Sequence, residues 1–390
     1  MARKLKSDKL LFTATLALVC ASLVMVYSAS AAIGMEQQYH QRPAYFLVKQ
    51  ITFALVGLAL IPILMKIDYR HYRQPVVIWS ALGLLAFALV GVLLFGPRLN
   101  GARRWFGFAG VGVQPSEFAK LVVIIFVSAI LERRMDRIDD LRYSLFPVAV
   151  AIGGIVGLIM LEPDLGTALS IILIVSAMVF AAGISYRYLI GLALVAVPAA
   201  TIVLLSADYR RRRMMVFLDP WQDPLGDGFQ VIQSLIAVGT GGLFGRGLMN
   251  GVQKLFYLPY PHTDFIYSVI GEELGLAGCT VVLACFGVIA WRGLRTAMRA
   301  PDRFGAFLAL GITAMIIIQA FFNMSVTLGL LPTKGIPLPF VSFGGSSLLV
   351  SLIGMGILLN VSQHASASHV VTTVLEPVSA PPSLRQTADA

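Results

Sequence analysis

Apolar runs of about 20 residues recur along most of this chain, and they limit its fold more than any other feature. A run of that length can cross the hydrocarbon core of a bilayer as an α-helix. Hydrophobic residues make up 57% of the 390 residues and charged residues 13%, against about 25% charged residues in an ordinary soluble domain. The sequence therefore predicts an all-α polytopic membrane protein.

About ten transmembrane helices are expected. The first span, Leu10–Ile33, follows a basic segment as a signal peptide would, but it is longer than the roughly 7–15 apolar residues of such a peptide. We therefore expect it to be retained. The other expected spans are Tyr45–Met65, Val76–Phe95, Pro115–Leu131, Leu145–Leu161, Leu165–Gly183, Tyr188–Ser206, Asp264–Trp291, Phe304–Leu330 and Phe340–Val361. Residues 1–362 thus form the membrane domain, and residues 363–390, rich in Ser, Ala, Thr and Pro, are expected to be a disordered tail.

The distribution of Lys and Arg predicts the orientation. Connections on the side of the N-terminus carry far more of them than the short connections on the other side, which places both termini in the cytoplasm. The net charge of +10 then reflects topology, and nucleic acid binding is not expected. One long extracytoplasmic loop, residues 207–262, breaks the pattern. Its apolar pieces predict short helices at the outer interface, and its glycines suit tight turns or close backbone approach to a ligand.

Asp264 stands where this loop meets the next apolar run, shortly after Pro259 and Pro261. A carboxylate on the first turn of a membrane helix is costly to desolvate and is a functional candidate by default. The structural alternative is a helix cap, in which Thr263 or Asp264 accepts a backbone N–H. The local sequence is compatible with both interpretations.

Further polar residues lie near spans on the same outer side. Glu117 and Lys120 share a helix face and are expected to pair, which alone would be structural. Arg103 and Arg104 occupy an outer connection, and arginine is well suited to phosphate. Trp105 beside them is expected to be an interfacial anchor.

Two more outer segments carry polar side chains. Glu162 and Asp164 flank Pro163, which is expected to start a helix, so acidic residues in its first turn have a structural explanation. Lys334 and the serines after it stand in LLPTKGIPLPFVSFGGSS, a broken segment that is tolerated at membrane depth only if buried in protein or lining a cavity. Cations and carboxylates thus converge on an outward-facing cavity. A lipid-phosphate enzyme and a transporter both fit this description.

Five long motifs now give a resemblance to a known family. They are NGARRWFGFAGVGVQPSEFAK, LEPDLGTA, FLDPWQDPLGDGFQVIQSLIAVGTGGLFGRGL, KLFYLPYPHTDFIYSVIGEELG and GLLPTKGIPLPFVSFGGSS. In this order they resemble the SEDS family (shape, elongation, division and sporulation), the membrane peptidoglycan glycosyltransferases typified by FtsW and RodA. The segment PTKG is similar to the division-type branch, and an elongation-type polymerase is the alternative. Tyr260 departs from the family pattern, which commonly has Glu there.

The resemblance implies a SEDS-type fold and polymerisation of lipid II into glycan strands at the outer face of the bacterial cytoplasmic membrane. It implies Asp264 as the general base, undecaprenyl pyrophosphate as the leaving group with inversion, and Arg103, Lys120 or Arg210–Arg213 as its positive partners. The candidate substrate-binding residues are Arg103, Arg104, Trp105, Gln114, Glu117, Lys120, Asp164, His262, Lys334 and Ser346. A divalent cation, Mg²⁺ or Mn²⁺, would suit a pyrophosphate, but no ligand cluster in the sequence demands one.

The resemblance also implies partners, and two alternative functions stay open. The expected partners are lipid II, the undecaprenyl-linked glycan, a class B penicillin-binding transpeptidase similar to FtsI, and other membrane proteins of the division machinery. The main alternative function is a lipid II flippase, which needs the same cations but also access from both leaflets. A purely scaffolding subunit ranks last, because it leaves the costly outer-side charges without a purpose.

Overall fold

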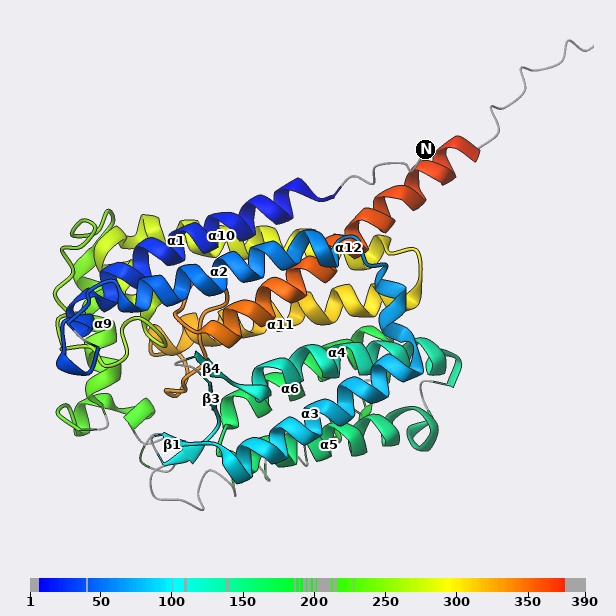
Figure 1. The fold of residues 1–390 in the computed structure, drawn as a ribbon, viewed down its shortest axis with the longest axis horizontal. Coiled ribbons are helices and arrows are strands. Elements are labelled where there is room, and N and C mark those ends of the chain that lie inside the picture. The colour runs from blue at the N-terminus through cyan, green and yellow to red at the C-terminus, as the bar shows by residue number, and fades with distance from the viewer. Residues whose placement is uncertain are drawn as a thin grey trace, which may run out of the picture.

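The computed structural model describes residues 7–375, except residues 40, 100, 109–110, 138–139 and 227 and most of residues 186–215. Long helices run along the longest axis of the molecule, and the connections gather at its two ends (Figure 1). The long helices are α1 (Lys9–Gly34), α2 (Tyr45–Leu64), α3 (Pro75–Phe95), α4 (Pro115–Arg134), α5 (Phe146–Leu161), α6 (Leu165–Ala181), α10 (Ile266–Arg299), α11 (Arg303–Thr327) and α12 (Gly345–Leu375).

These helices coincide with the expected spans to within a few residues at most ends, which confirms the all-α polytopic fold. Within the described part of the chain, α1, α2, α3, α10, α11 and α12 are long and apolar enough to cross a membrane, while α5 and α6 are apolar but shorter. The expected span Tyr188–Ser206 lies mostly outside the described residues. Helix α12 continues to Leu375, past the start of the expected tail, and residues 376–390 are outside the description.

Short helices and strands complete the fold, and the sequence did not predict the two hairpins that the strands form. Antiparallel hairpins, β1 with β2 and β3 with β4, fold the outer connection between α3 and α4. The short elements are η1 (Gln37–Tyr39), η2 (Tyr69–Arg73), β1 (Arg98–Leu99), β2 (Ala102–Arg103), β3 (Phe106–Phe108), β4 (Val111–Val113), η3 (Met135–Arg137), η4 (Leu141–Leu145), η5 (Pro220–Gln222) and α9 (Phe229–Gly241). Helix α9 is a short helix of the kind expected in the long outer loop.

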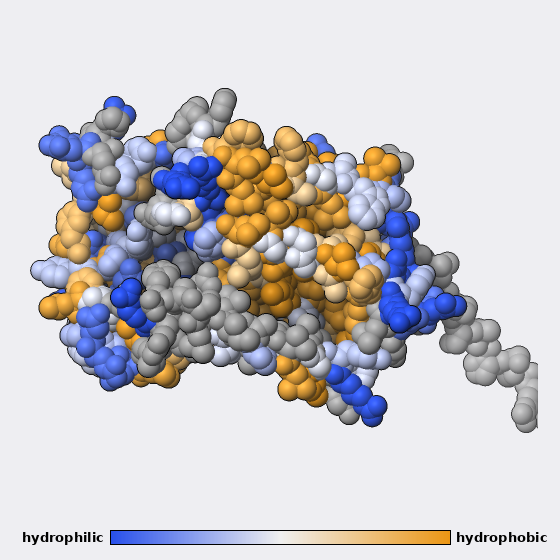
Figure 2. Space-filling model, turned by 90° about the horizontal axis from the view of Figure 1, so that it is seen from below, coloured by the Kyte–Doolittle hydropathy of each residue, from blue (hydrophilic) through white to orange (hydrophobic). Residues whose placement is uncertain are grey.

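The helices differ in how deeply they are buried. Helix α12 packs against α2, and α11 packs against α4, α6 and α10. The apolar windows of α11 and α12 are 67% and 83% buried, whereas that of α3 is only 28% buried. Figure 2 shows a lateral face with an apolar field across its middle and hydrophilic residues toward both ends. Exposed Phe87 and Leu84 of α3 suit contact with lipid chains.

Helix α10 is interrupted at Gly275, and the loop after α9 fills the break. Gly275 has a φ of +67°, so the amides after it and the carbonyls before it lose their helical partners. The N–H groups of Leu276 and Ala277 donate to the carbonyls of Gly242 and Leu243 at 2.9 and 3.1 Å. In return, Arg246 N–H donates to the Glu272 carbonyl at 2.9 Å, and Gly247 N–H to the Glu273 carbonyl at 3.0 Å.

Glycine is required on both sides of this junction. A Cβ on Gly245, which has a φ of +77°, would lie 2.1 Å from the Glu273 carbonyl oxygen. A Cβ on Gly275 would lie 2.3 Å from the Gly245 nitrogen. The sequence predicted tight turns or close approach to a ligand for the loop glycines; at Gly245 the structure shows close approach to the backbone of α10.

Candidate functional site

Asp264 lies in a turn before α10 and not on its first helical turn. The helix begins at Ile266, and Phe265 is its N-cap, without a side-chain hydrogen bond. The expected position of Asp264 on the first helical turn is therefore wrong, and the alternative in which Thr263 or Asp264 is the N-cap does not hold either. The Asp264 main-chain carbonyl instead accepts a hydrogen bond from Asn323 Nδ2 of α11 at 2.8 Å. Tertiary contacts, rather than the helix, hold this turn.

The connection between α11 and α12 passes directly beside the half-buried Asp264 side chain. A Cβ placed on Gly335 would lie 2.9 Å from Asp264 Oδ2, so a larger residue there would force the carboxylate or the segment around it to shift. Asn323 Nδ2 also donates to the Ile336 carbonyl at 2.8 Å, and the Ser342 hydroxyl donates to the Thr263 carbonyl at 2.6 Å. The α11–α12 connection thus surrounds Asp264, and the two motifs lie at the same end of the bundle, as the sequence predicted.

Lys334, next to Gly335 in the chain, lies within the electrostatic influence of a second carboxylate, that of Asp164. Burial lowers the pKa of Lys334, and the negative charge of Asp164 opposes this effect. Ile336 packs on Gly166, whose Cβ would meet Ile336 Cγ1 at 3.1 Å. The segment 334–336 therefore runs between Asp264 on one side and the start of α6 on the other.

Asp164 is both the N-cap of α6 and the centre of a polar cluster. Its Oδ1 accepts from Thr167 N–H at 3.1 Å, and its Oδ2 accepts from Thr167 Oγ1 at 2.8 Å and Gln114 Nε2 at 3.1 Å. The helix-start interpretation of Asp164 is confirmed, although α6 begins at Leu165 and Pro163 stays in the preceding turn. Gln114 N–H donates to Ser346 Oγ at 3.0 Å, which ties α4 to α12 beside this cluster.

The expected pair on α4 is present and buried. Lys120 Nζ lies 2.9 Å from Glu117 Oε2, and these residues are 3% and 4% exposed. Ser116, next to Glu117, is buried and lies 3.5 Å from Asp164 Oδ2. The ion pair therefore adjoins the Asp164 cluster in sequence, with its charges already mutually compensated.

His262 precedes Asp264 by two residues in a largely aromatic surrounding. Its ring lies 4.5 Å from that of Phe46 and 5.6 Å from that of Phe343. Burial lowers its pKa to about 4, so the imidazole is neutral near pH 7. Its carbonyl accepts from Phe343 N–H at 2.9 Å, which again fastens the turn to the last connection.

Arg103 and Arg104 are directed to backbone carbonyls rather than to the carboxylates. Arg103 Nη1 donates to the Leu94 carbonyl at 2.5 Å, at the end of α3. Arg104 Nε and Nη2 donate to the carbonyls of Glu162 and Pro163 at 2.8 and 2.7 Å. Both guanidinium groups thus bind the ends of helices, where cations are favourable.

Trp105 and the basic run Arg210–Arg213 are two further predicted features of the site. The Trp105 ring packs on Gly112, where a Cβ would lie 3.1 Å from Trp105 Cε3, so this side chain packs within the hairpin region. Of the basic run Arg210–Arg213, three residues fall outside the described part of the chain, which leaves its expected role without a structural counterpart.

Glu162 is the most unusual carboxyl group in this region. It is 0% exposed, and within the described part of the chain neither carboxylate oxygen has a hydrogen-bond partner. Burial raises its pKa to about 8, the charge of Asp164 adds to this, and Arg104 opposes it. Glu162 is thus mainly protonated near pH 7.

The protonation of Glu162 should make the stability of the folded protein depend on pH. The folded protein holds the Glu162 proton up to about pH 8, while the unfolded chain releases it near 4.5. The stability that Glu162 contributes is therefore present below pH 4.5 and lost as pH rises to 8. We expect the melting temperature of the wild type to fall between pH 5 and 8 more steeply than that of Glu162→Gln. Parallel curves would contradict this expectation, and the surface variant Glu132→Gln is the control.

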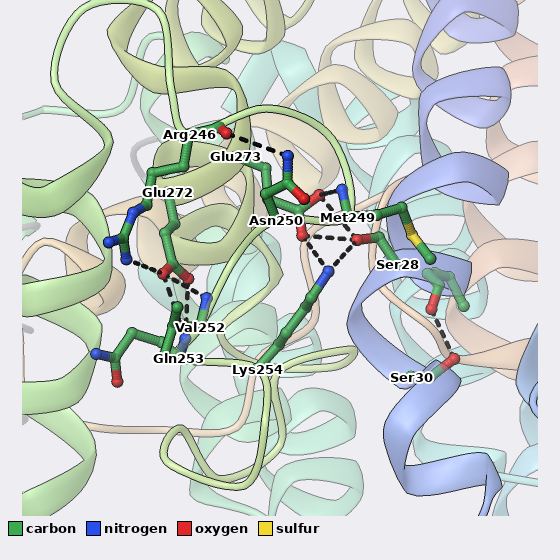
Figure 3. Close-up of polar contacts among 11 residues, drawn as sticks. Ser28, Ser30, Arg246, Met249, Asn250, Val252, Gln253, Lys254, Glu272 and Glu273 are labelled. Atoms are coloured by element: carbon green, nitrogen blue, oxygen red, sulfur yellow. Dashed lines mark hydrogen bonds and ion pairs between the residues drawn. The ribbon is translucent and has the colours of Figure 1, made fainter.

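Two buried glutamates that were not among the predicted site residues form a polar network with the loop after α9 (Figure 3). Glu272 and Glu273 of α10 are both 0% exposed. Glu272 Oε1 accepts from Val252 N–H at 2.7 Å, and its carboxylate also contacts Gln253 N–H and Arg246. Both lie inside the expected span Asp264–Trp291, where an acidic residue is costly, and this signal could have identified them from the sequence.

Glu273 holds the loop to α1 as well. Its Oε1 lies 2.6 Å from Lys254 Nζ, and the Ser28 hydroxyl donates to the same carboxylate at 2.6 Å. Met249 N–H donates to Oε2 at 3.1 Å. A Cβ on Gly251 would come within 3.0 Å of both carboxylates, so glycine is needed there too. The network thus holds residues 246–254 against α10, and this segment ends ten residues before Asp264 in the chain.

The arrangement supplies particular chemical groups. The half-buried carboxylate of Asp264 lies beside Gly335, and the half-buried Lys334 precedes this glycine in the chain. Within the described residues, no three His, Cys, Asp or Glu side chains come together as a metal site would require. The site offers a base and a cation to a substrate that carries a hydroxyl and a phosphate.

Known proteins resemble this chain over most of its length. A "Probable peptidoglycan glycosyltransferase FtsW" of Geobacter metallireducens is 43% identical over 358 residues, covering 91% of this chain and 94% of that protein. "Stage V sporulation protein E" of Bacillus subtilis is 42% identical over 368 residues, covering 93% of this chain and 99% of that protein.

Solved structures share the fold. A chain from a peptidoglycan synthase complex, studied for its coordination of polymerization and crosslinking, aligns with a TM-score of 0.76 at 31% identity, covering 93% of this chain and 99% of that one. The rod shape determining protein RodA of Thermus thermophilus aligns with a TM-score of 0.68 at 28% identity, covering 92% and 97%.

The match to a family model extends over nearly the whole membrane domain. The model, FtsW/RodA/SpoVE with the description "Cell cycle protein", matches residues 8–367. This range includes all the helices around Asp264 and the network of Glu272 and Glu273. The chain therefore belongs to the FtsW/RodA/SpoVE family of cell cycle proteins.

Proposed function

We propose that this chain is a peptidoglycan glycosyltransferase that polymerises lipid II at the outer face of the bacterial cytoplasmic membrane, during cell division. The names of the FtsW relatives support the activity and the branch. The observation that carries the proposal is the Asp264 carboxylate beside Gly335, with Lys334 the preceding residue, at the end of the bundle that we expect to face outward.

In the proposed reaction, the acceptor sugar hydroxyl attacks the anomeric carbon of the donor, and undecaprenyl pyrophosphate leaves with inversion. The Asp264 carboxylate takes the hydroxyl proton. A carboxylate within hydrogen-bond reach of that hydroxyl can take its proton as a general base. Such a base contributes roughly 10²–10⁴-fold to the rate.

Lys334 is proposed to stabilise the pyrophosphate as its charge develops. Arg103 and Arg104 are engaged with backbone carbonyls, and Lys120 is compensated by Glu117 at 2.9 Å. Lys334 lacks such a close ion pair among the described residues and is influenced by Asp164. Burial lowers the pKa of Lys334, and the negative charge of a bound anion would favour its charged form. The residues Gln114, Asp164, His262 and Ser346 are proposed to shape the pocket around these two groups.

The partner and the orientation belong to the same proposal. A relative of known structure works within a peptidoglycan synthase complex that coordinates polymerization and crosslinking. We propose a class B transpeptidase as the partner of this chain, and cytoplasmic termini on the basis of the basic connections.

Reconstitution of the purified protein with its candidate transpeptidase tests this function. Labelled lipid II is supplied with transpeptidation blocked, and products are resolved on a gel. Glycan ladders from the wild type and none from Asp264→Ala are the expected result. Transfer of lipid II across liposomes by a folded complex that makes no ladder would instead establish the flippase.

Gly335→Ala tests whether the position of the Asp264 carboxylate matters. The added methyl group would lie 2.9 Å from Asp264 Oδ2, so the carboxylate must move. Because misplacement by about 1 Å can cost roughly 10²-fold in rate, we expect turnover to fall about 10–100-fold with little change in melting temperature. Gly344→Ala is the matched control, since only Ser347 Cβ lies within 4 Å of its added Cβ, at 3.7 Å. Wild-type turnover by Gly335→Ala would contradict the assignment.

A further inference from the structure

A cavity with a basic lining lies at the end of the bundle opposite the candidate site. It is a half-open cavity of about 230 Å³, lined by the start of α1, the last turns of α10 and the middle of α12. The N-terminal start of α1 marks this end in Figure 1. The lining residues are Asp8, Arg292, Arg295, Thr296, Arg299, Ser362 and Ala365.

The single carboxylate of this lining is already engaged. Asp8 Oδ2 lies 2.6 Å from both Arg292 Nε and Arg292 Nη2, a two-point ion pair. Asp8 Oδ1 accepts from Leu11 N–H at 3.2 Å as the N-cap of α1. Within the described part of the chain, Arg295 and Arg299 have no carboxylate at ion-pair distance, so the cavity holds two uncompensated cations.

The helix dipole explains only part of this clustering of arginines. The spacing of Arg292, Arg295 and Arg299 puts all three on one face of α10, where like charges repel. The helix dipole favours a cation only within the last turn, which holds Arg299. Arg292 and Arg295 lie further inside the helix. A bound anion would remove the repulsion.

The surface beside the cavity is apolar. Trp291, Leu294 and Met298 of the same helix are 56%, 44% and 80% exposed, and the Arg292 guanidinium lies 5.4 Å from the centre of the Trp291 ring. Tryptophan is enriched at the membrane–water interface. A phospholipid whose phosphate lies in the cavity can therefore place its acyl chains against this neighbouring surface.

We propose that this cavity binds the phosphate of an anionic lipid in the cytoplasmic leaflet. Arginine forks match phosphate oxygens in a two-point geometry, and basic pockets between membrane helices on the cytoplasmic side bind such headgroups. The cytoplasmic side follows from the positive-inside distribution. The site is separate from the proposed catalytic cluster and goes beyond it.

Binding of short-chain lipids to the full-length protein in detergent tests this site. Melting temperature is followed while dihexanoyl phosphatidylglycerol, dihexanoyl phosphatidylcholine or inorganic phosphate is added. We expect saturable stabilisation by phosphatidylglycerol and an apparent affinity at least about tenfold weaker in Arg295→Gln/Arg299→Gln. The matched control is Arg137→Gln/Arg303→Gln, which removes the same charge from the same end outside the cavity.

Each outcome decides the proposal. Loss of affinity in the cavity variant but not in the control supports it. Equal loss in both variants would reduce the effect to overall charge and overturn the site. Equal stabilisation by phosphatidylcholine would overturn the preference for an anionic lipid. Displacement of phosphatidylglycerol by millimolar inorganic phosphate would assign the cavity to a free anion instead.

Discussion

Replacement of Asp264 by Asn is expected to reduce glycan polymerisation about 10²–10⁴-fold while leaving the fold intact. Asparagine has nearly the same size but cannot accept the proton of the sugar hydroxyl. The hydrogen bond that fixes this turn uses the Asp264 main-chain carbonyl and Asn323, so the substitution preserves it. Initial rates of ladder formation from labelled lipid II measure the loss, and the melting temperature should change little.

The control for this variant is a second carboxylate on the same side of the membrane. Asp219 is exposed and caps η5 by accepting from Trp221 N–H, a role that Asn fills equally well. Asp219→Asn should therefore polymerise at the wild-type rate. If Asp264→Asn retains that rate as well, Asp264 is not the base, and the carboxyl of Asp164 becomes the next candidate to replace.

The spans were predictable from the sequence because membrane helices depend on length and hydropathy alone. The boundaries of α2 and α3 agree with the expected ones to within a residue. The ion pair of Glu117 and Lys120 was equally predictable, since helical spacing determines it. Hairpins β1–β2 and β3–β4 were not, because their strands are only two or three residues long.

The local setting of Asp264 and the arginines depends on contacts that are distant in sequence. The Asp264 turn is held by Asn323, 59 residues away, so its sequence resembled a helix start. Arg104 donates to the carbonyl of Glu162, 58 residues away, which no spacing rule indicates. The sequence predicted the same side of the membrane for both residues, but it could not predict the direction of their side chains.

The network of Glu273 and Lys254 should dominate the stability of the outer loop. Glu273→Ala would leave the Lys254 ammonium, 4% exposed, without its carboxylate. Loss of one partner of a buried ion pair costs about 3–5 kcal/mol, and the loop would come loose from α10 and α1. We expect a marked fall in the melting temperature, measured by intrinsic fluorescence in detergent.

A double-mutant cycle separates the ion pair from the space that its side chains fill. Lys254→Met keeps an apolar chain of similar length, and Glu273 retains Ser28 and Met249 N–H as partners. The double variant Glu273→Ala/Lys254→Met should therefore lose less stability than the two single losses together, by about 0.5–3 kcal/mol. The surface pair Arg73–Glu132, with side chains 47% and 21% exposed, is the comparison and should show coupling below about 1 kcal/mol. Additive losses at Glu273 and Lys254 would mean that their charges do not interact. The hold on residues 246–254 would then come from the glycine-dependent backbone junction at Gly245 and Gly275.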